Sequence, residues 1–425
     1  MKSRAVTLKA AFGLSMISTP AFANVFDTYG QSAGTISIGN ATTAGGTQAF
    51  AAYTNPALLV TAKKNEISAQ AILTRFDLQD LPEAANSPLP RDKDRASQAD
   101  DLQGNSVGMN FTLTEGFHLG LAAYMPQGSF GRIKGVSSYQ SSYLRYSENQ
   151  GKPSIYTAIG VELPYGFSVG LGAYYSLRAK GVLQIALTST ESEGRVDLNM
   201  EPVVAPYAGV AWTNQTMTFG LLYREAQKTD SKIDSGFSLT TEDFSLPFNA
   251  NTSLVPFYDP AMFRFGAAYS LNAVQLLFSF EQAQWGRYKT ALVSLTGNDV
   301  ASISAEANNA NANLRDTQAY RLGTILPFTG PMDQAFEFRS GLEFHTSANK
   351  PNTRGSVIDP ARQSLAVGLN WQLKADSQGR RLAVETAYQY SQLSATDRVS
   401  AKGAEIHLKS GHSLQTFVGG LDYEL

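Results

Sequence analysis

The sequence predicts an all-β fold, a 14-stranded antiparallel transmembrane β-barrel, preceded by an N-terminal segment for which a hatch (plug) inside the lumen is one of two arrangements considered below. From about residue 65 onward, large apolar residues occupy every second position in short segments, which is the period of a strand with two unlike faces. The positions between them are mostly Gly, Ser, Asn, Thr and Ala, whereas the polar face of a soluble sandwich would be densely charged. Short and long connections also alternate along the chain, as in membrane barrels.

Composition narrows the alternatives. The chain has 425 residues, of which 43% are hydrophobic and 16% are charged, with a formal net charge of -2. This composition is too apolar for a disordered chain and too neutral for a nucleic-acid binder. The absence of cysteine excludes a disulfide scaffold, a thiolate zinc site and a cysteine nucleophile. Beyond residue 23 no run reaches the roughly 18 apolar residues of a membrane-spanning helix.

Residues 1–23 have the features of a secretory signal peptide. Lys2, Arg4 and Lys9 form a positive start, an uncharged and mostly apolar run follows, and Ala21-Phe22-Ala23 supplies small residues before the cleavage point. We expect cleavage before Asn24 and export to or beyond a bacterial-type periplasm.

Residues 24–64 do not alternate and are rich in Gly, Ala and Thr. Asn55 before Pro56 is typical of a helix N-cap followed by proline at the first helical position, so we expect a short helix to begin there. Two arrangements are open for this segment, a flexible leader or a plug folded into the lumen.

The barrel is expected from residue 65 to residue 425. The alternating segments number fourteen, and an even number is typical of a single-chain barrel: 65–76, 104–114, 117–126, 153–163, 167–180, 202–213, 216–228, 259–270, 274–294, 316–327, 334–347, 361–374, 381–395 and 412–425. Short links are expected to be periplasmic turns, at 164–166, 214–215 and 271–273. Long polar links are expected to be outer loops, at 77–103, 127–152, 181–201, 229–258, 295–315, 348–360 and 396–411.

If the large apolar residues face lipid, the opposite parity faces the lumen and carries charges of both signs. We expect many of these charges to pair across strands. The inward set is Tyr174, Arg178, Lys180, Arg224, Arg264, Glu281, Trp285, Arg287, Lys289, Arg321, Glu337, Arg339, Glu343 and Glu385.

A signal peptide, a glycine-rich leader that ends in Asn55-Pro56-Ala57-Leu58 and fourteen strands resemble the FadL family of outer-membrane transporters. That family carries long-chain fatty acids and other hydrophobic compounds, including aromatic hydrocarbons. Further stretches fit its layout, at 260–264, 319–323, 338–342 and 417–423. The chain ends in Leu425, where such barrels usually end in Phe.

The resemblance implies a mechanism of passive transport across the bacterial outer membrane. The leader would be a hatch with the motif Asn55, Pro56, Ala57 and Leu58, and Asn24, Val25 and Phe26 would form its moving tip. A kink at the end of the third strand would open the wall laterally, at Met125, Pro126 and Gly128. Proline cannot donate a ladder hydrogen bond, so a break there is physically reasonable, although Pro126 could simply end the strand. Candidate contacts to a ligand head group are Arg178, Lys180, Arg287 and Lys289.

We therefore expect a monomeric, multi-pass barrel in the bacterial outer membrane without a cofactor or a metal. Its partners would be a fatty acid or an aromatic hydrocarbon, outer-membrane lipids and lipopolysaccharide, and the barrel-assembly machinery, but not nucleic acid. The alternative is a general diffusion porin for small polar solutes, and a structural or adhesin barrel is a further one. An outer-membrane hydrolase is disfavoured, because the adjacent His412 and Ser413 would point to opposite faces of one strand.

Overall fold

The computed structural model describes residues 25–81, 101–127, 141–146, 152–188, 192–241, 244–288, 292–297, 313–330, 334–355, 357–400 and 403–425. The predicted signal peptide at 1–23 and the predicted site residues Asn24, Gly128 and Lys289 lie outside these ranges. Among the described helices, none is long and apolar enough to cross a membrane.

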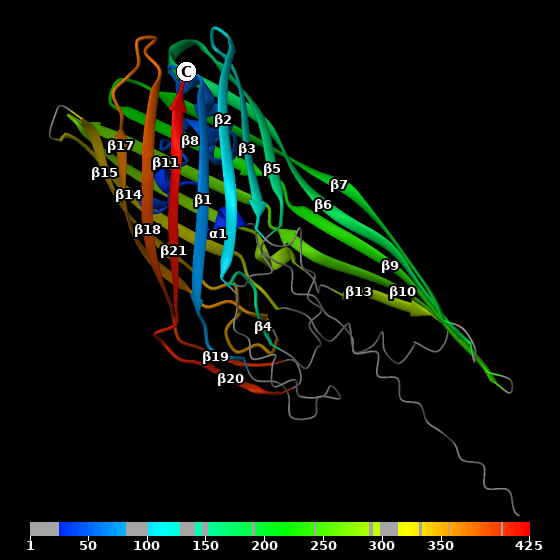
Figure 1. Ribbon diagram of the computed structural model, residues 1–425. Coiled ribbons are helices and arrows are strands. Elements are labelled where there is room, and N and C mark those ends of the chain that lie inside the picture. The colour runs from blue at the N-terminus through cyan, green and yellow to red at the C-terminus, as the bar shows by residue number, and fades with distance from the viewer. Residues whose placement is uncertain are drawn as a thin grey trace, which may run out of the picture.

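Fourteen antiparallel strands form a closed ring (Figure 1), as the sequence predicts. Closure follows from the first strand, which pairs on one side with the second and on the other side with the last. In ring order the strands are β1 Glu66–Asp77, β2 Leu102–Thr114, β3 Phe117–Pro126, β5 Ser154–Glu162, β6 Phe167–Thr188, β7 Ser192–Thr213, β8 Met217–Arg224, β11 Met262–Leu271, β12 Val274–Ala283, β14 Thr317–Thr329, β15 Ala335–His345, β17 Arg362–Gln372, β18 Arg381–Leu393 and β21 Ser413–Glu424.

The two faces of the ring differ as the alternation predicts. On β6, Leu171 on the outer face is 61% exposed, whereas Tyr174 on the inner face is 0% exposed. Eight strand residues of the inward set are buried: Tyr174, Arg224, Arg264, Glu281, Arg321, Arg339, Glu343 and Glu385. An apolar outer face and a polar, filled interior are the pattern of a lipid-facing barrel.

Two predicted loops are wrong. The range 181–201 was expected to be a loop, but β6 and β7 continue through it and pair from Phe167↔Trp212 to Leu187↔Ser192. The range 229–258 is occupied by β9 Gln227–Thr241 and β10 Phe244–Asp259. The sequence keeps its two-residue period beyond the barrel, for example at Leu183, Ile185 and Leu187, and strand pairing satisfies the backbone there.

These strands form an arm that projects beyond the outer end of the ring (Figure 1). Within the arm β9 pairs in parallel with β6, and β10 pairs with β13 Leu292–Gly297. The expected segments 216–228 and 274–294 are therefore each divided, because β8 ends at Arg224 and β12 ends at Ala283. The smaller outer elements are β4 Ser142–Tyr143, β16 Val357–Ile358, β19 Thr396–Val399, β20 Glu405–Leu408 and the 3₁₀ turn η6 Trp285–Arg287. At the other end of the ring, the 3₁₀ turn η5 Pro164–Gly166 joins β5 to β6.

Candidate functional site: the hatch inside the barrel

The segment before β1 lies inside the ring (Figure 1). It folds into α1 Val25–Tyr29, α2 Ala33–Ser37, η1 Gln48–Phe50, α3 Ala51–Thr54 and η2 Pro56–Thr61. We call residues 25–62 the hatch. The side chains of Phe26, Tyr29, Ile36, Phe50 and Tyr53 are at most 2% exposed. Of the two arrangements open at the sequence level, the structure has the folded plug.

The hatch backbone packs directly against the wall. A Cβ atom added at Gly341 would lie 2.0 Å from the amide nitrogen of Gly39, and one added at Gly170 would lie 2.3 Å from the carbonyl carbon of Pro56. Ten glycines, each on a different strand, face the hatch in this way, and we call them the glycine belt: Gly108, Gly120, Gly160, Gly170, Gly209, Gly220, Gly266, Gly323, Gly341 and Gly368. The glycine belt therefore packs against the hatch as closely as residues pack in a protein core, because glycine has no Cβ atom.

The Asn55-Pro56 motif starts a helix, as predicted. The Asn55 side chain accepts a hydrogen bond from the amide of Ala57 at 3.1 Å, and Pro56 is the first residue of η2. The same side chain donates to the carbonyl oxygen of Thr43 at 2.9 Å. Ala57 and Leu58 are buried beneath the wall. The motif therefore ties two turns of the hatch together and presses η2 against β5, β6 and β7.

The side chain of Phe26 on α1 inserts into a group of tyrosines. Its ring centroid lies 5.1 Å from that of Tyr53, 5.8 Å from that of Tyr124 and 6.0 Å from that of Tyr156. Tyr156 stacks in turn on Tyr174 at 4.4 Å. We call Tyr53, Tyr124, Tyr156, Tyr174 and Tyr207 the tyrosine cluster, and each of them is at most 4% exposed. The cluster surrounds an apolar group at the tip of the hatch.

Asp27, next to Phe26, binds arginines of β8 and β11. It forms ion pairs with Arg224 and, at 2.9 Å, with Arg264, and it accepts a hydrogen bond from Tyr53. Burial raises the pKa of Tyr53 well above its usual range, so its hydroxyl stays protonated and remains a donor.

Alternating charges continue from Asp27 around the lumen. Arg264 pairs with Glu281 at 2.6 Å, Glu281 with Arg321 at 3.0 Å, Arg321 with Glu343 at 3.1 Å and Glu343 with Arg362 at 2.9 Å. Arg362 then donates to the carbonyl oxygen of Thr28 at 2.6 Å. This charge ladder, Asp27, Arg224, Arg264, Glu281, Arg321, Glu343 and Arg362, therefore begins and ends on α1.

The alternation in the sequence predicts that most residues of the charge ladder face the lumen, and the structure confirms this. The sequence interpretation missed Asp27 and Arg362. The inward parity of β17 was a usable signal for Arg362, but a single acidic residue in a leader gave none for Asp27. The interpretation also missed the function of the inward glycines, which it read only as small residues between apolar ones.

The structure describes three of the four cations that the sequence suggests as contacts to a ligand head group. Arg178 is half-buried and pairs with Glu201 at 2.6 Å across β6 and β7, and Arg287 is exposed in η6. Lys180 belongs to the outer part of β6. The hatch tip is instead bound by Arg224, Arg264 and Arg362.

The end of β3 is asymmetric within the described residues. On one side it pairs with β2 as far as Pro126↔Gly104, whereas on the other side its pairing with β5 ends at Tyr124↔Ser154. Met125 and Pro126 thus extend past the last described rung with β5. Tyr124 from the tyrosine cluster lies at this point, where a Cβ atom on Gly104 would be 2.3 Å from its hydroxyl oxygen.

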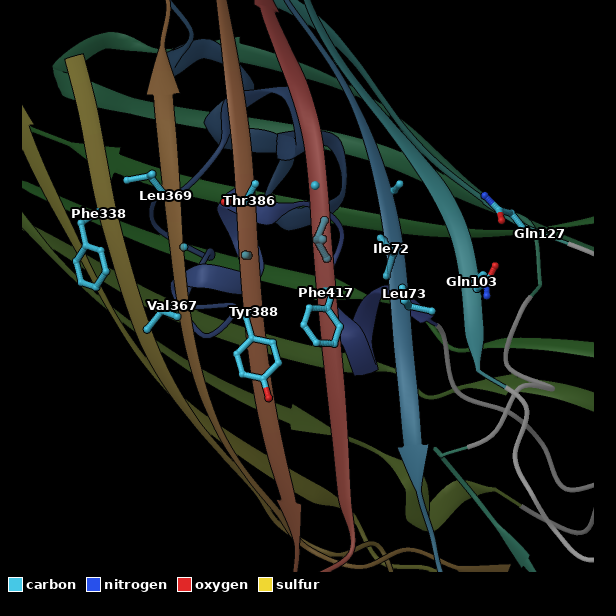
Figure 2. A pocket seen from close by; sticks show the side chains of 15 residues that line it. Ile72, Leu73, Gln103, Gln127, Phe338, Val367, Leu369, Thr386, Tyr388 and Phe417 are labelled. Atoms are coloured by element: carbon cyan, nitrogen blue, oxygen red, sulfur yellow. The ribbon is translucent and has the colours of Figure 1, made fainter. Parts of the chain in front are cut away.

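A hollow of about 930 Å³ lies on the outer face of the wall, over β15, β17, β18, β21 and β1 (Figure 2). Phe338, Leu369 and Phe417 rise around it, and Ala71 and Gly419 contribute its low floor. Most of its labelled side chains point away from the hatch in Figure 2. The hollow therefore belongs to the lipid-facing surface. Among the described residues no group of His, Cys, Asp and Glu could hold a metal ion.

Comparison with known proteins agrees with this architecture. No protein-family model matches the chain. The chain is similar to alkane uptake protein A of Marinobacter nauticus, with 23% identity over 98% of this chain and 96% of the relative. Among solved structures it is similar to a Pseudomonas aeruginosa FadL homologue, with a TM-score of 0.58, 12% identity, and coverage of 96% of this chain and 99% of that chain. It is also similar to the Pseudomonas putida toluene transporter TodX, with a TM-score of 0.55, 12% identity, and coverage of 94% and 99%.

The solved structures establish that the chain shares the fold of the FadL homologue and of TodX over nearly its whole length. The relatives are named for uptake or transport, or as a FadL homologue.

Proposed function

We propose that this chain is an outer-membrane channel for the passive uptake of a hydrophobic small molecule. Residues 24–64 act as the hatch, and cargo leaves sideways through the wall at the end of β3. The relatives support the cargo class, since they are named for alkane uptake and toluene transport.

The glycine belt carries the proposal. On each of ten strands of the ring, a Cβ atom added at the glycine of the belt would lie within 3 Å of a hatch atom. A diffusion porin needs a water-filled lumen lined by charge, whereas here the charges pair with one another and with the hatch. A hatch built in this way favours a guarded route for apolar cargo over free diffusion of polar solutes.

The end of β3 is the proposed exit. Pro126 lacks an amide hydrogen, and pairing with β5 ends at Tyr124, so the ladder is weakest there. Phe26 and the tyrosine cluster lie directly behind this strand end. Displacement of Phe26 would therefore leave an apolar space against the weakest part of the wall.

The surroundings of α1 favour an uncharged hydrocarbon as cargo. Arg224 and Arg264 share Asp27 as an ion-pair partner in this state, so a fatty acid carboxylate would have to displace Asp27 to reach them. An alkane or an aromatic hydrocarbon needs only the place of Phe26. Contacts between a ligand head group and the cations that the sequence suggests, Arg178, Lys180, Arg287 and Lys289, remain a prediction.

The test uses cells that lack their own hydrocarbon channel and produce the full chain. Uptake of radiolabelled hexadecane, toluene and oleate is measured, together with the permeability of proteoliposomes to small sugars. We expect saturable uptake of at least one apolar probe and low sugar permeability. A variant that lacks residues 24–30 should admit sugars, because the tip of the hatch is gone.

The matched control is Leu365→Val, which removes one methylene group from the outer face of β17 and leaves the lumen unchanged. It should transport and exclude sugars like the native chain. If the native protein passes sugars freely and takes up none of the three apolar probes, the diffusion-porin interpretation holds and the proposal is wrong.

A further inference from the structure

A short segment of the connection between β3 and β5 crosses to the opposite side of the ring. It comprises residues 141–146, and its strand β4 pairs in parallel with β16, Ser142 with Val357 and Tyr143 with Ile358. The amide of Leu144 also donates to the carbonyl oxygen of Ile358 at 2.9 Å. In ring order β3 and β5 lie across from β15 and β17, which flank β16. The segment therefore lies at the outer mouth of the barrel, on the side of β15 and β17.

A buried ion pair fastens the far end of this segment. Arg145 is 4% exposed and donates to both carboxylate oxygens of Asp359, at 2.6 Å and 2.8 Å. Its guanidinium also lies 2.7 Å from the ring of His345 and donates to the carbonyl oxygen of Thr346 at 3.3 Å. A bidentate, desolvated pair of this kind fixes geometry strongly.

Apolar packing covers the hatch beneath the segment. Leu144 and Tyr146 are 0% exposed. Tyr143 and Tyr146 belong to the same buried cluster as Val25, Phe26 and Tyr29 of α1. Leu144 points into a second cluster, which includes Trp285. The segment is thus a structural layer between the hatch tip and the outside.

One hydrogen bond joins this layer to the hatch. The Tyr29 hydroxyl donates to the carbonyl oxygen of Arg145 at 2.9 Å, and the bond is buried. Burial raises the pKa of Tyr29 well above its usual range, so the hydroxyl stays a donor. Tyr29 is the last residue of α1. The same helix contains Phe26, which packs in the tyrosine cluster, and Asp27, which belongs to the charge ladder.

We propose that residues 141–146 form an outer lid over the hatch, held shut by the Arg145–Asp359 pair, and that Tyr29 makes the lid and α1 move together. The inference rests on the proposed transport function, because a lid matters only if cargo enters from the outside. A lid that is either docked or released is a two-state element, and an apolar cargo that replaces Tyr143 and Tyr146 over α1 would favour the released state.

A reversible cross-link tests the lid. The native chain has no cysteine, so Ser142→Cys with Val357→Cys gives one defined pair, and paired strands hold Cα atoms about 5 Å apart, within the range of a disulfide. We expect hexadecane uptake by the oxidised variant in cells to fall roughly tenfold or more, as for a population held in one state, and reductant to restore it. Unchanged uptake with a complete cross-link would overturn the lid.

The matched control is Asp397→Cys with His407→Cys. These residues pair across β19 and β20 within a single outer loop, so their disulfide does not cross the mouth. Uptake by this control should be the same in the oxidised and reduced forms. A loss equal to that of the Ser142/Val357 pair would overturn the proposal, because the effect would then not depend on the lid.

A second measurement needs no transport. A single cysteine at Val25→Cys, buried on α1, is labelled with a membrane-impermeant maleimide added outside intact cells. We expect Arg145→Ala to speed labelling roughly tenfold, and we expect no further acceleration when Tyr29→Phe is already present, because coupled groups are not additive. Equal rates with and without Arg145→Ala would contradict the lid, and simple additivity would contradict the link through Tyr29.

The two measurements separate the inference from the proposed function. If no apolar probe is taken up by the native chain, the proposed function fails. The labelling rates still decide whether the lid covers α1 and whether Tyr29 couples them.

Discussion

The inner and outer faces of the same wall follow different rules. On β15, Arg339, Gly341 and Glu343 face the lumen, where the two charges form buried ion pairs and Gly341 lies against the hatch backbone. The neighbouring Phe338 and Leu342 face outward and are 40% exposed. The outer face needs only apolar bulk to match lipid. The inner face must match the shape and charge of the hatch, so we expect it to tolerate substitution far less.

The largest difference should come from adjacent residues of β15. Gly341→Val places a side chain where a Cβ atom alone would lie 2.0 Å from the backbone of Gly39. Because neither backbone can move freely, we expect a loss of at least about 3 kcal/mol in the free energy of unfolding. Leu342→Val on the outer face should cost less than about 1 kcal/mol. Urea unfolding in detergent measures both, and similar losses would show that the faces do not differ.

The charge ladder should come next. Arg321→Met leaves Glu281 and Glu343 in place with one partner fewer each. Removing one partner of a buried pair typically costs about 3–5 kcal/mol. The control is Arg380→Met, which breaks the exposed pair with Asp376 in a turn and should not move the unfolding midpoint. If Arg321→Met shifts the unfolding midpoint as little as the control does, water enters the lumen and screens these charges.

A third change addresses the end of β3, where cargo is proposed to pass from the inner to the outer face. Pro126→Thr restores an amide hydrogen at the end of β3 and favours a longer strand. We expect uptake of apolar probes to fall severalfold while the folded fraction on a gel stays that of the native chain. The control Pro327→Thr, on β14 away from the proposed exit, should leave uptake unchanged. Native uptake in Pro126→Thr would argue against an exit at this strand end.

The smallest effect should come from the outer hollow. A Cβ atom on Gly419 would meet only the carbonyl oxygen of Glu385, at 3.9 Å, so Gly419→Leu fills the hollow without a clash. We expect the unfolding midpoint and the uptake of hexadecane to stay near the native values. A clear fall in uptake would place the hollow on the cargo route and would remove the distinction between a working inner face and a passive outer face.

The sequence predicts the outer face well, because lipid imposes one simple rule on it. Leu365, Val367 and Leu369 alternate so regularly that β17 follows directly, and the same argument gives all fourteen strands. Parity then places Arg264 and Glu281 inside, but the choice of these two as partners follows from the strand register, which only the structure gives.

The arm and the hatch contacts are harder to predict. The parallel pairing of β6 with β9 joins residues about fifty positions apart in the chain, and no local sequence pattern predicts it. Asp27 is one acidic residue in a leader of small residues, and its importance comes from Arg224 and Arg264, which only the closed ring brings to it. The Arg145–Asp359 pair likewise depends on a chain crossing that sequence periodicity does not encode.

The glycine belt also constrains the order of assembly. The hatch has no room to thread into a finished ring, because the wall backbone lies against it on ten strands. The ring closes only when β21 pairs with β1 along Glu66–Asp77. The hatch, which is synthesised before every strand, must therefore be in place while this seam is still open. The final strand of the chain thus seals its beginning inside, and a chain that stops before β21 would leave the hatch open to proteases.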